Sequence, residues 1–158
     1  MLRYARTAGH TPGRDRAVAR FSALGEHAGV WLAIGAGGYA LDAGRRSAWA
    51  RALRALLFTY ALNTALKLVV RRRRPQLPGL EPLAGTPTAL SFPSAHASTS
   101  FAGARLYSRL GLPPAPLYAL AASLSLSRLY LGVHYPSDVL AGAALGSLTG
   151  TVAGRGEG

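Results

Sequence analysis

Four uncharged and mostly apolar stretches divide this chain, and they limit the folds that it can adopt. They cover residues 28–41, 55–66, 110–127 and 139–153. Each is shorter than the roughly 20 residues with which a helix spans a bilayer, but flanking arginines can extend a span because their stems lie along apolar surface. Only 15% of the residues are charged, against about 25% in soluble domains. We therefore expect an all-α fold, an integral-membrane helical bundle, with a soluble helical core as the alternative.

Helix breakers and charges between these stretches predict about five transmembrane helices. They would lie at about residues 26–42, 47–70, 94–110, 117–131 and 136–153. Before them, residues 15–26 could form a short amphipathic helix on the membrane surface. Residues 71–90 hold four arginines and four prolines, a composition typical of a loop. The chain thus divides into a basic N-terminal segment with an interfacial helix, residues 1–25, and a membrane domain, residues 26–154.

The net charge of +12 bears on the partners of the chain. In a soluble protein such a charge would suggest nucleic acid binding. Here the arginines cluster between apolar runs, as they do in the loops of membrane proteins. We therefore expect no nucleic acid partner, and favour the bilayer, anionic lipid headgroups and phosphate substrates. The chain has no cysteine, which excludes disulfides, thiolate metal sites and cysteine nucleophiles.

The second predicted span ends in two cations that suit a phosphate. Lys67 is followed by six residues and then by Arg74-Pro75, so the two cations would share a side if the helix continued to Pro75. Lysine supplies a point charge and arginine a planar fork, and a phosphate accepts from both. The alternative interpretation is a basic stop-transfer run, which residues 71–73 resemble.

The third predicted span begins with Pro93-Ser94-Ala95-His96. Ser94 could cap the helix while free backbone N–H groups of the first turn point at an anion. His96 would then stand in that first turn and face the loop. The alternative is an ordinary N-cap followed by a surface histidine.

A third polar segment joins the last two spans. Ser127-Arg128 is followed by His134 and Asp138, and the last two residues are four positions apart, on one face of a helix start. A carboxylate in a membrane segment is costly and usually functional, and it would orient the imidazole and make it more nucleophilic. Alternatives are a structural ion pair between Arg128 and Asp138, or an acid that stabilises the helix N-terminus.

The five-span topology places these three segments together. The loop after the second span, the start of the third, the end of the fourth and the start of the fifth all face the same side of the membrane. Together the segments offer cations, imidazoles, a hydroxyl and a carboxylate. That set could bind a phosphate, attack its phosphorus and protonate the leaving oxygen.

The order and spacing of these residues resemble those of the type 2 phosphatidic acid phosphatases, whose superfamily includes the vanadium haloperoxidases. The family pattern is Lys-x6-Arg-Pro, then Pro-Ser-Gly-His, then Ser-Arg-x5-His-x3-Asp, and the resemblance covers about residues 47–150. One position departs from it, because Ala95 stands where the family has glycine. Alanine restricts the backbone but keeps the N–H that the family's glycine donates to phosphate.

The resemblance implies a role for each residue. His134 would attack phosphorus and form a phosphohistidine, Asp138 would orient His134, and His96 would protonate the leaving oxygen. The phosphate oxygens would be held by Lys67, Arg74, Ser94, the N–H of Ala95, and Arg128. No metal or other cofactor would be needed, and the sequence shows no carboxylate cluster that suits Mg²⁺.

We therefore expect residues 26–154 to form a membrane phosphatase domain that removes phosphate from a lipid monophosphate or diphosphate. Polyprenyl substrates are favoured, such as undecaprenyl diphosphate or decaprenylphosphoryl-5-phosphoribose, with which small family members are associated in cell-wall arabinan synthesis. Phosphatidic acid and phosphatidylglycerol phosphate are alternatives. The bias toward Ala, Arg and Gly suggests a high-GC bacterium, and hence a bacterial cell membrane. Cations divide almost evenly between the two faces, so the positive-inside rule only weakly favours a cytoplasmic site.

Two other classes of protein compete with this expectation. A haloperoxidase would hold vanadate in the same pocket, but it would need a soluble and usually much larger scaffold. A non-catalytic membrane module that binds anionic lipid would explain the charge. It would not explain Asp138 or the two histidines.

Overall fold

The computed structural model describes residues 2–154, and within that range the chain is helical and has no β-strand. The helices are α1 (Leu2–Thr7), α2 (Pro12–Ala23), α3 (Gly29–Leu41), α4 (Arg46–Val70), α5 (Ala95–Arg109), α6 (Pro114–Tyr130) and α7 (Pro136–Ala153), with the short 3-10 helices η1 (Glu26–Ala28) and η2 (Ala43–Arg45). The all-α prediction is confirmed. Met1, which belongs to the predicted N-terminal segment, lies outside the described residues.

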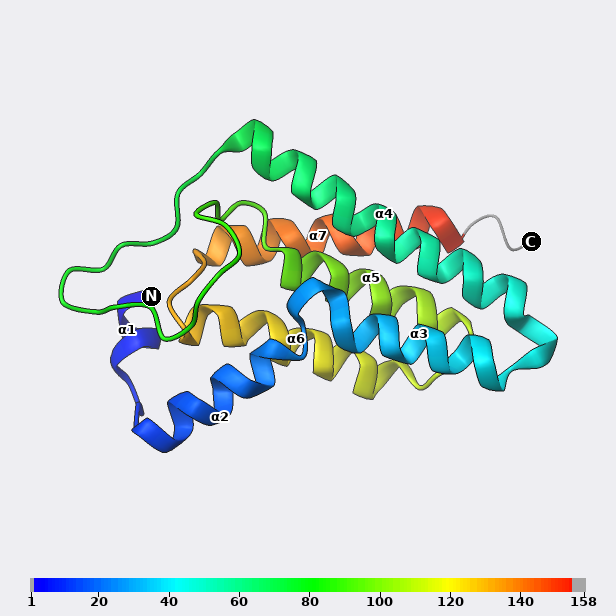
Figure 1. Cartoon of the computed structure of the whole chain (residues 1–158), viewed down its shortest axis with the longest axis horizontal. Coiled ribbons are helices and arrows are strands. Elements are labelled where there is room, and N and C mark those ends of the chain that lie inside the picture. Colours follow the sequence, from blue (N-terminus) through cyan, green and yellow to red (C-terminus); the bar gives the residue numbers. More distant parts are fainter. Residues whose placement is uncertain (1, 155–158) are drawn as a thin grey trace.

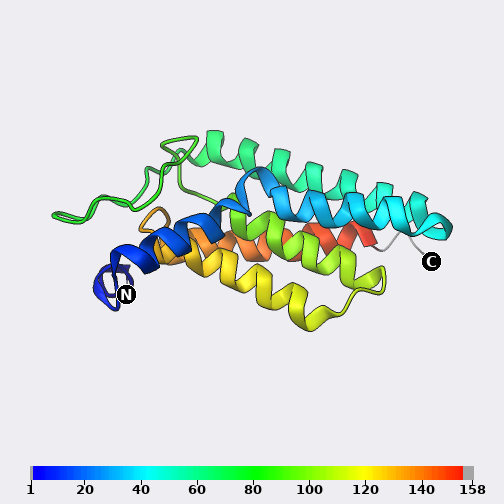
Figure 2. The same ribbon diagram turned by 60° about the horizontal axis from the view of Figure 1, so that its bottom comes forward.

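The five longer helices α3 to α7 run side by side along the length of the molecule (Figures 1 and 2). Helix α5 is the centre of the bundle, because it contacts α3, α4, α6 and α7. Trp31 of α3, Leu56 of α4 and Tyr107 of α5 itself are fully buried in this core. The Tyr107 hydroxyl donates a hydrogen bond to the Trp31 carbonyl (2.7 Å), which satisfies a polar group inside the apolar core.

Helix α7 approaches α5 closely because small residues line its inner face. A Cβ atom at Gly146 would lie 2.0 Å from the Ser98 carbonyl oxygen, and one at Gly142 would lie 2.5 Å from that of Ser94. Any side chain at these positions would separate the two helices. The contact fixes the N-terminus of α7 against the N-terminus of α5.

Local sequence signals determine where α5 and α7 begin and where α4 ends. Ser94 precedes α5 and its hydroxyl accepts from the Ala97 N–H (3.5 Å), as expected of an N-cap. Pro136 occupies the first turn of α7, where its missing N–H has no cost. Helix α4 ends at Val70, and Arg71 after it takes a left-handed conformation (φ 53°) that turns the chain into the loop.

The predicted spans correspond to helices α3 to α7, and the predicted interfacial helix to α2, which begins earlier than expected, at Pro12. Among the described residues, one helical stretch, Ala43–Val70, is long and apolar enough to cross a membrane by length and composition (28 residues, mean hydropathy 1.4). Helix α3 has only 13 residues, which rise about 20 Å. The count of five transmembrane helices is therefore not confirmed and stays a prediction.

Candidate active site

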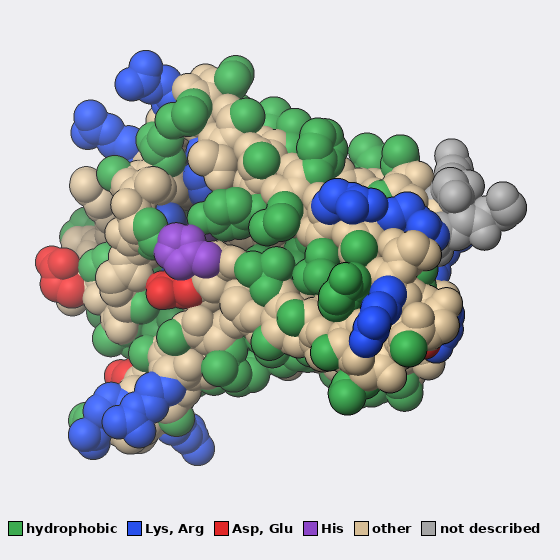
Figure 3. Space-filling view, turned by 45° about the vertical axis from the view of Figure 1, so that its right-hand side comes forward, with side chains coloured by type: hydrophobic (Ala, Val, Ile, Leu, Met, Phe, Trp, Pro, Cys, Tyr) green, Lys and Arg blue, Asp and Glu red, His purple; other side chains and the backbone are tan. Residues whose placement is uncertain are grey.

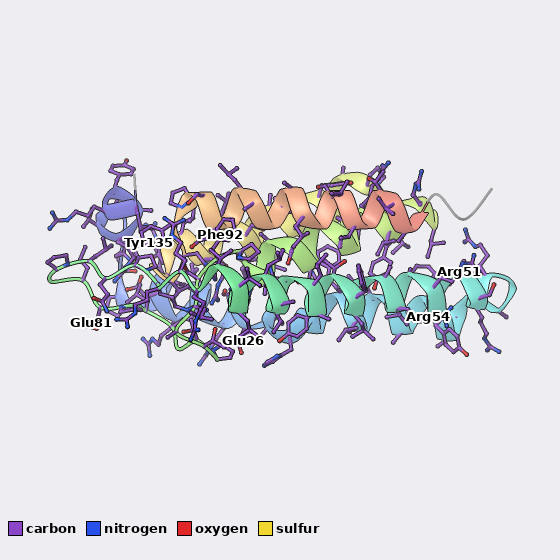
Figure 4. The ribbon with its side chains drawn as sticks, turned by 90° about the horizontal axis from the view of Figure 1, so that it is seen from above. Glu26, Arg51, Arg54, Glu81, Phe92 and Tyr135 are labelled. Carbon is purple, nitrogen blue, oxygen red and sulfur yellow. The ribbon has the colours of Figure 1, made fainter. Side chains whose placement is uncertain are left out.

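The three polar segments meet at one end of the bundle. The C-terminal ends of α4 and α6 and the N-terminal ends of α5 and α7 lie together there, with the loop between α4 and α5 beside them (Figure 1). Figure 4 labels Glu26 and Tyr135 at this end, and Arg51 and Arg54 at the other. The predicted convergence of the segments is therefore confirmed.

A cavity of about 120 Å³ opens among these helix ends. Six of the predicted site residues line it: Lys67, Arg74, Ala95, His96, Arg128 and His134. The other two, Ser94 and Asp138, are fully buried and contact each other through the Ser94 N–H, which donates to the Asp138 carbonyl oxygen (2.9 Å). The structure thus brings all eight predicted residues to one place.

His134 lies in the connection between α6 and α7, with a cation on one side and a carboxylate on the other. Its Nε2 lies 3.1 Å from Nη1 of Arg74, and its Nδ1 lies 3.4 Å from Oδ2 of Asp138. Because a guanidinium can only donate, Nε2 must be the unprotonated nitrogen and Nδ1 must carry the proton. This tautomer directs a lone pair from Nε2 into the cavity.

The surroundings of His134 keep its imidazole neutral. Burial lowers the pKa of His134 to about 4, against the opposing effect of Asp138, and the charges of Arg74, Lys67 and Arg128 lower it further. A neutral imidazole has the free lone pair that a nucleophile needs.

Asp138 is fixed from two sides. Its Oδ2 accepts from the Tyr135 N–H (2.8 Å), which caps helix α7. Its Oδ1 accepts from Nη1 of Arg72 (3.1 Å), and that guanidinium also donates to the Ser137 hydroxyl (2.8 Å) and lies over the Tyr135 ring. The partner of Asp138 is therefore Arg72, and the alternative of an ion pair with Arg128 is wrong.

Two cations are held by backbone carbonyls of the connections beside the cavity. Nζ of Lys67 donates to the carbonyl oxygens of Pro93 (2.7 Å) and Ser91 (3.2 Å). Arg74 donates through Nε to the Thr88 carbonyl (2.8 Å) and through Nη1 to the Val133 carbonyl (2.8 Å). Because α4 ends at Val70, Arg74 reaches the cavity from the loop and not from a continued helix.

His96 and Arg128 also line the cavity and are buried, with 7% and 2% of their surface exposed. Both contact Ser22, at the end of α2. Nε2 of His96 donates to the Ser22 carbonyl oxygen (3.0 Å), and Nη1 of Arg128 donates to the Ser22 hydroxyl (2.6 Å). The interpretation of His96 as a surface histidine is therefore wrong.

Several residues at the site could not be found from sequence patterns. Ser22 lies in no recognisable pattern, and Arg72 lies in a run of four arginines that looked like a stop-transfer signal. The cavity wall also includes residues 25–28, Tyr60 and Thr64. Among residues 2–154, no group of three or more His, Asp or Glu side chains is placed to hold a metal ion.

A family model described as the PAP2 superfamily matches residues 48–155. The chain belongs to the PAP2 superfamily, as the three motifs indicated.

Curated relatives support the same assignment. The decaprenylphosphoryl-5-phosphoribose phosphatase of Mycolicibacterium smegmatis is 40% identical over 131 residues, which are 83% of this chain and 72% of that protein. The protein of the same name from Mycobacterium tuberculosis is 39% identical over 141 residues, which are 89% of this chain and 79% of that protein. With the family, these relatives identify the chain as a phosphatase.

Two solved structures share the fold. Aquifex aeolicus LpxE superimposes with a TM-score of 0.82 at 26% identity. The superposition covers 98% of this chain and 92% of the LpxE chain. A transmembrane PAP2-type phosphatidylglycerolphosphate phosphatase from Bacillus subtilis superimposes with a TM-score of 0.75 at 24% identity, covering 99% and 82%. The second likeness shows the fold alone.

Proposed function

We propose that this protein is an integral-membrane lipid phosphatase that acts through a phosphohistidine on His134. The observation that carries the proposal is the placement of His134. Its unprotonated Nε2 faces a cavity lined by Lys67, Arg74 and Arg128, while its Nδ1 faces the buried carboxylate of Asp138. A nucleophile, an orienting carboxylate and three cations for a phosphate thus occupy one small space.

The first step transfers the phosphoryl group to the enzyme. The substrate phosphate replaces Nε2 of His134 as an acceptor for Arg74, and Lys67, Arg128 and the Ala95 N–H in the first turn of α5 hold its other oxygens. The Nε2 lone pair attacks phosphorus and the bond from phosphorus to the lipid oxygen breaks. His96 enters this step with protons on both ring nitrogens and gives the Nδ1 proton to that oxygen, while its Nε2 proton stays on the Ser22 carbonyl. Asp138 stabilises the charge that the imidazole gains.

The second step restores the enzyme. A water molecule loses a proton to His96 and attacks the phosphohistidine. The bond from phosphorus to Nε2 breaks and inorganic phosphate leaves. Fixed cations perform the charge stabilisation throughout, because they are already held by loop carbonyls before the substrate binds.

The surface of the bundle supports a lipid substrate. Large apolar side chains on α4, α6 and α7 are more than half exposed, among them Phe58, Leu126 and Leu140. Figure 3 shows hydrophobic side chains across the middle of one face, with Lys and Arg toward its two ends. Such a surface suits hydrocarbon in the middle and headgroups at the ends, so a lipid tail could stay in the bilayer while its phosphate reaches the cavity.

We favour decaprenylphosphoryl-5-phosphoribose as the substrate, because two curated relatives at about 40% identity are named for it. The full chain in vesicles should release phosphate from this lipid faster than from undecaprenyl diphosphate, phosphatidic acid or phosphatidylglycerol phosphate. Short-chain, water-soluble analogues should be poorer still, since contacts with the tail help to position the phosphate. Equal or better turnover of soluble sugar phosphates or nucleotides would refute the lipid assignment and leave the phosphatase chemistry intact.

Activity should survive EDTA, because cations of the protein replace the metal ions that many phosphatases use. Vanadate should inhibit, because its trigonal-bipyramidal adduct resembles the transition state. Both effects can be measured as phosphate release from the same vesicles. A strict requirement for added Mg²⁺ or Mn²⁺ would show that the mechanism is different.

A further inference from the structure

Ser22, on α2, lies outside the residues that the family model matches, yet it contacts two residues of the site. It is 1% exposed. Its hydroxyl accepts from Nη1 of Arg128 (2.6 Å) and shares a hydrogen bond with the Ser127 hydroxyl (2.9 Å). Nε of Arg128 is buried without a partner, so the bond to Ser22 is important for the direction in which the guanidinium points.

The carbonyl of Ser22 acts on His96. A carbonyl oxygen can only accept, so Nε2 of His96, at 3.0 Å, must carry a proton. This leaves Nδ1 as the nitrogen that exchanges a proton with the substrate. Gly25 closes the same edge of the ring, because a Cβ atom there would lie 2.7 Å from Cδ2 of His96. The end of α2 therefore fixes both the orientation and the tautomer of His96.

The N-terminal segment is firmly held in this position. His10 stacks on Tyr130 with ring centroids 4.1 Å apart, and both side chains bond to Oδ1 of Asp15, at 2.8 and 2.7 Å. Arg6 is buried against Gly132, two residues before His134. These contacts join α1 and α2 to α6 and to the connection that carries His134.

We propose that Ser22 is a positioning residue of the active site, whose hydroxyl orients Arg128 and whose carbonyl orients His96. The N-terminal segment is then part of the catalytic unit, although it lies outside the family domain. Residues 25–28, which follow α2, line the cavity beside His96 and so form the wall on the side of the leaving group. The inference rests on the roles proposed above for Arg128 and His96.

The hydroxyl can be tested by Ser22→Ala in the full chain. We expect kcat/KM for the lipid to fall about ten- to a hundredfold, by analogy with residues that orient the ligands of a metal ion, and vanadate to inhibit more weakly by a similar factor. Ser125→Ala is the matched control, since Ser125 is also buried and its hydroxyl donates within α6, to the Ala121 carbonyl. It should change neither value.

A double variant separates positioning from general stability. If Ser22 acts through Arg128, Ser22→Ala should cost nothing further in the Arg128→Ala background, measured at high enzyme concentration. An equal loss in both backgrounds would overturn the role of the hydroxyl. If Arg128→Ala itself kept full activity, the role proposed for Arg128 would fail instead.

The role of the Ser22 carbonyl is tested by a substitution at Gly25, which contacts the same His96 ring. In Gly25→Ala, the new methyl group would displace the His96 ring, so the loss should be larger for a lipid phosphate than for p-nitrophenyl phosphate, whose leaving group needs no proton. Ser22→Ala, acting through a phosphate-binding cation, should reduce both activities equally. If Gly25→Ala reduced both equally, the positioning of His96 by the end of α2 would be refuted.

Discussion

Replacement of His134 by alanine is expected to lower turnover by several orders of magnitude. The variant loses the nitrogen that attacks phosphorus, and water in the enlarged cavity cannot replace a held nucleophile. Phosphate release from the lipid in vesicles measures the effect. A labelled phosphoryl group should be trapped on the wild-type chain in a short reaction and be absent from the variant.

The assignment can be contradicted in a simple way. A His134→Ala chain that keeps a tenth of wild-type turnover would show that another group attacks phosphorus. Ser125→Ala provides a control, because Ser125 is buried on α6 away from the cavity lining and its hydroxyl donates to the Ala121 carbonyl (2.7 Å). It should retain most of the activity, and both variants should elute and unfold like the wild type.

The place of the site could be predicted from the sequence because it depends on topology and on short-range signals. A chain of successive antiparallel helices returns alternate ends to the same side, so the three motifs had to meet. Ser94 and Pro136 mark where α5 and α7 begin, and His134 and Asp138 are four residues apart. Each of these relations can be seen within a few residues of the chain.

The contacts made by Ser22 and Arg72 could not be predicted in this way. Ser22 meets Arg128 from 106 positions away, and no pattern near either residue indicates the other. Arg72 is one of four consecutive arginines, and its direction depends on the left-handed conformation of Arg71, which follows the last residue of α4. Packing determines which of these arginines contacts Asp138, and this cannot be predicted from composition.

Replacement of His96 by alanine is expected to be severe for a lipid phosphate and much milder for p-nitrophenyl phosphate. Protonation of the leaving oxygen by a positioned group contributes about 10²–10⁴-fold to a rate. A lipid alkoxide or sugar oxygen needs that proton, whereas p-nitrophenolate is stable as an anion. The ratio of the two losses in kcat/KM, measured on one preparation of the full chain, reports the role directly.

The same ratio distinguishes proton transfer from phosphate binding. His96 lies beside Arg128 in the cavity, so it could instead hold a phosphate oxygen, a contact that every substrate shares. In that case His96→Ala would reduce both activities by the same factor. Arg128→Ala, which removes a proposed phosphate-binding cation, is the comparison variant for such an equal loss. A loss confined to the poor leaving group would assign the proton to His96, and to its Nδ1, because Nε2 is already bonded to the Ser22 carbonyl.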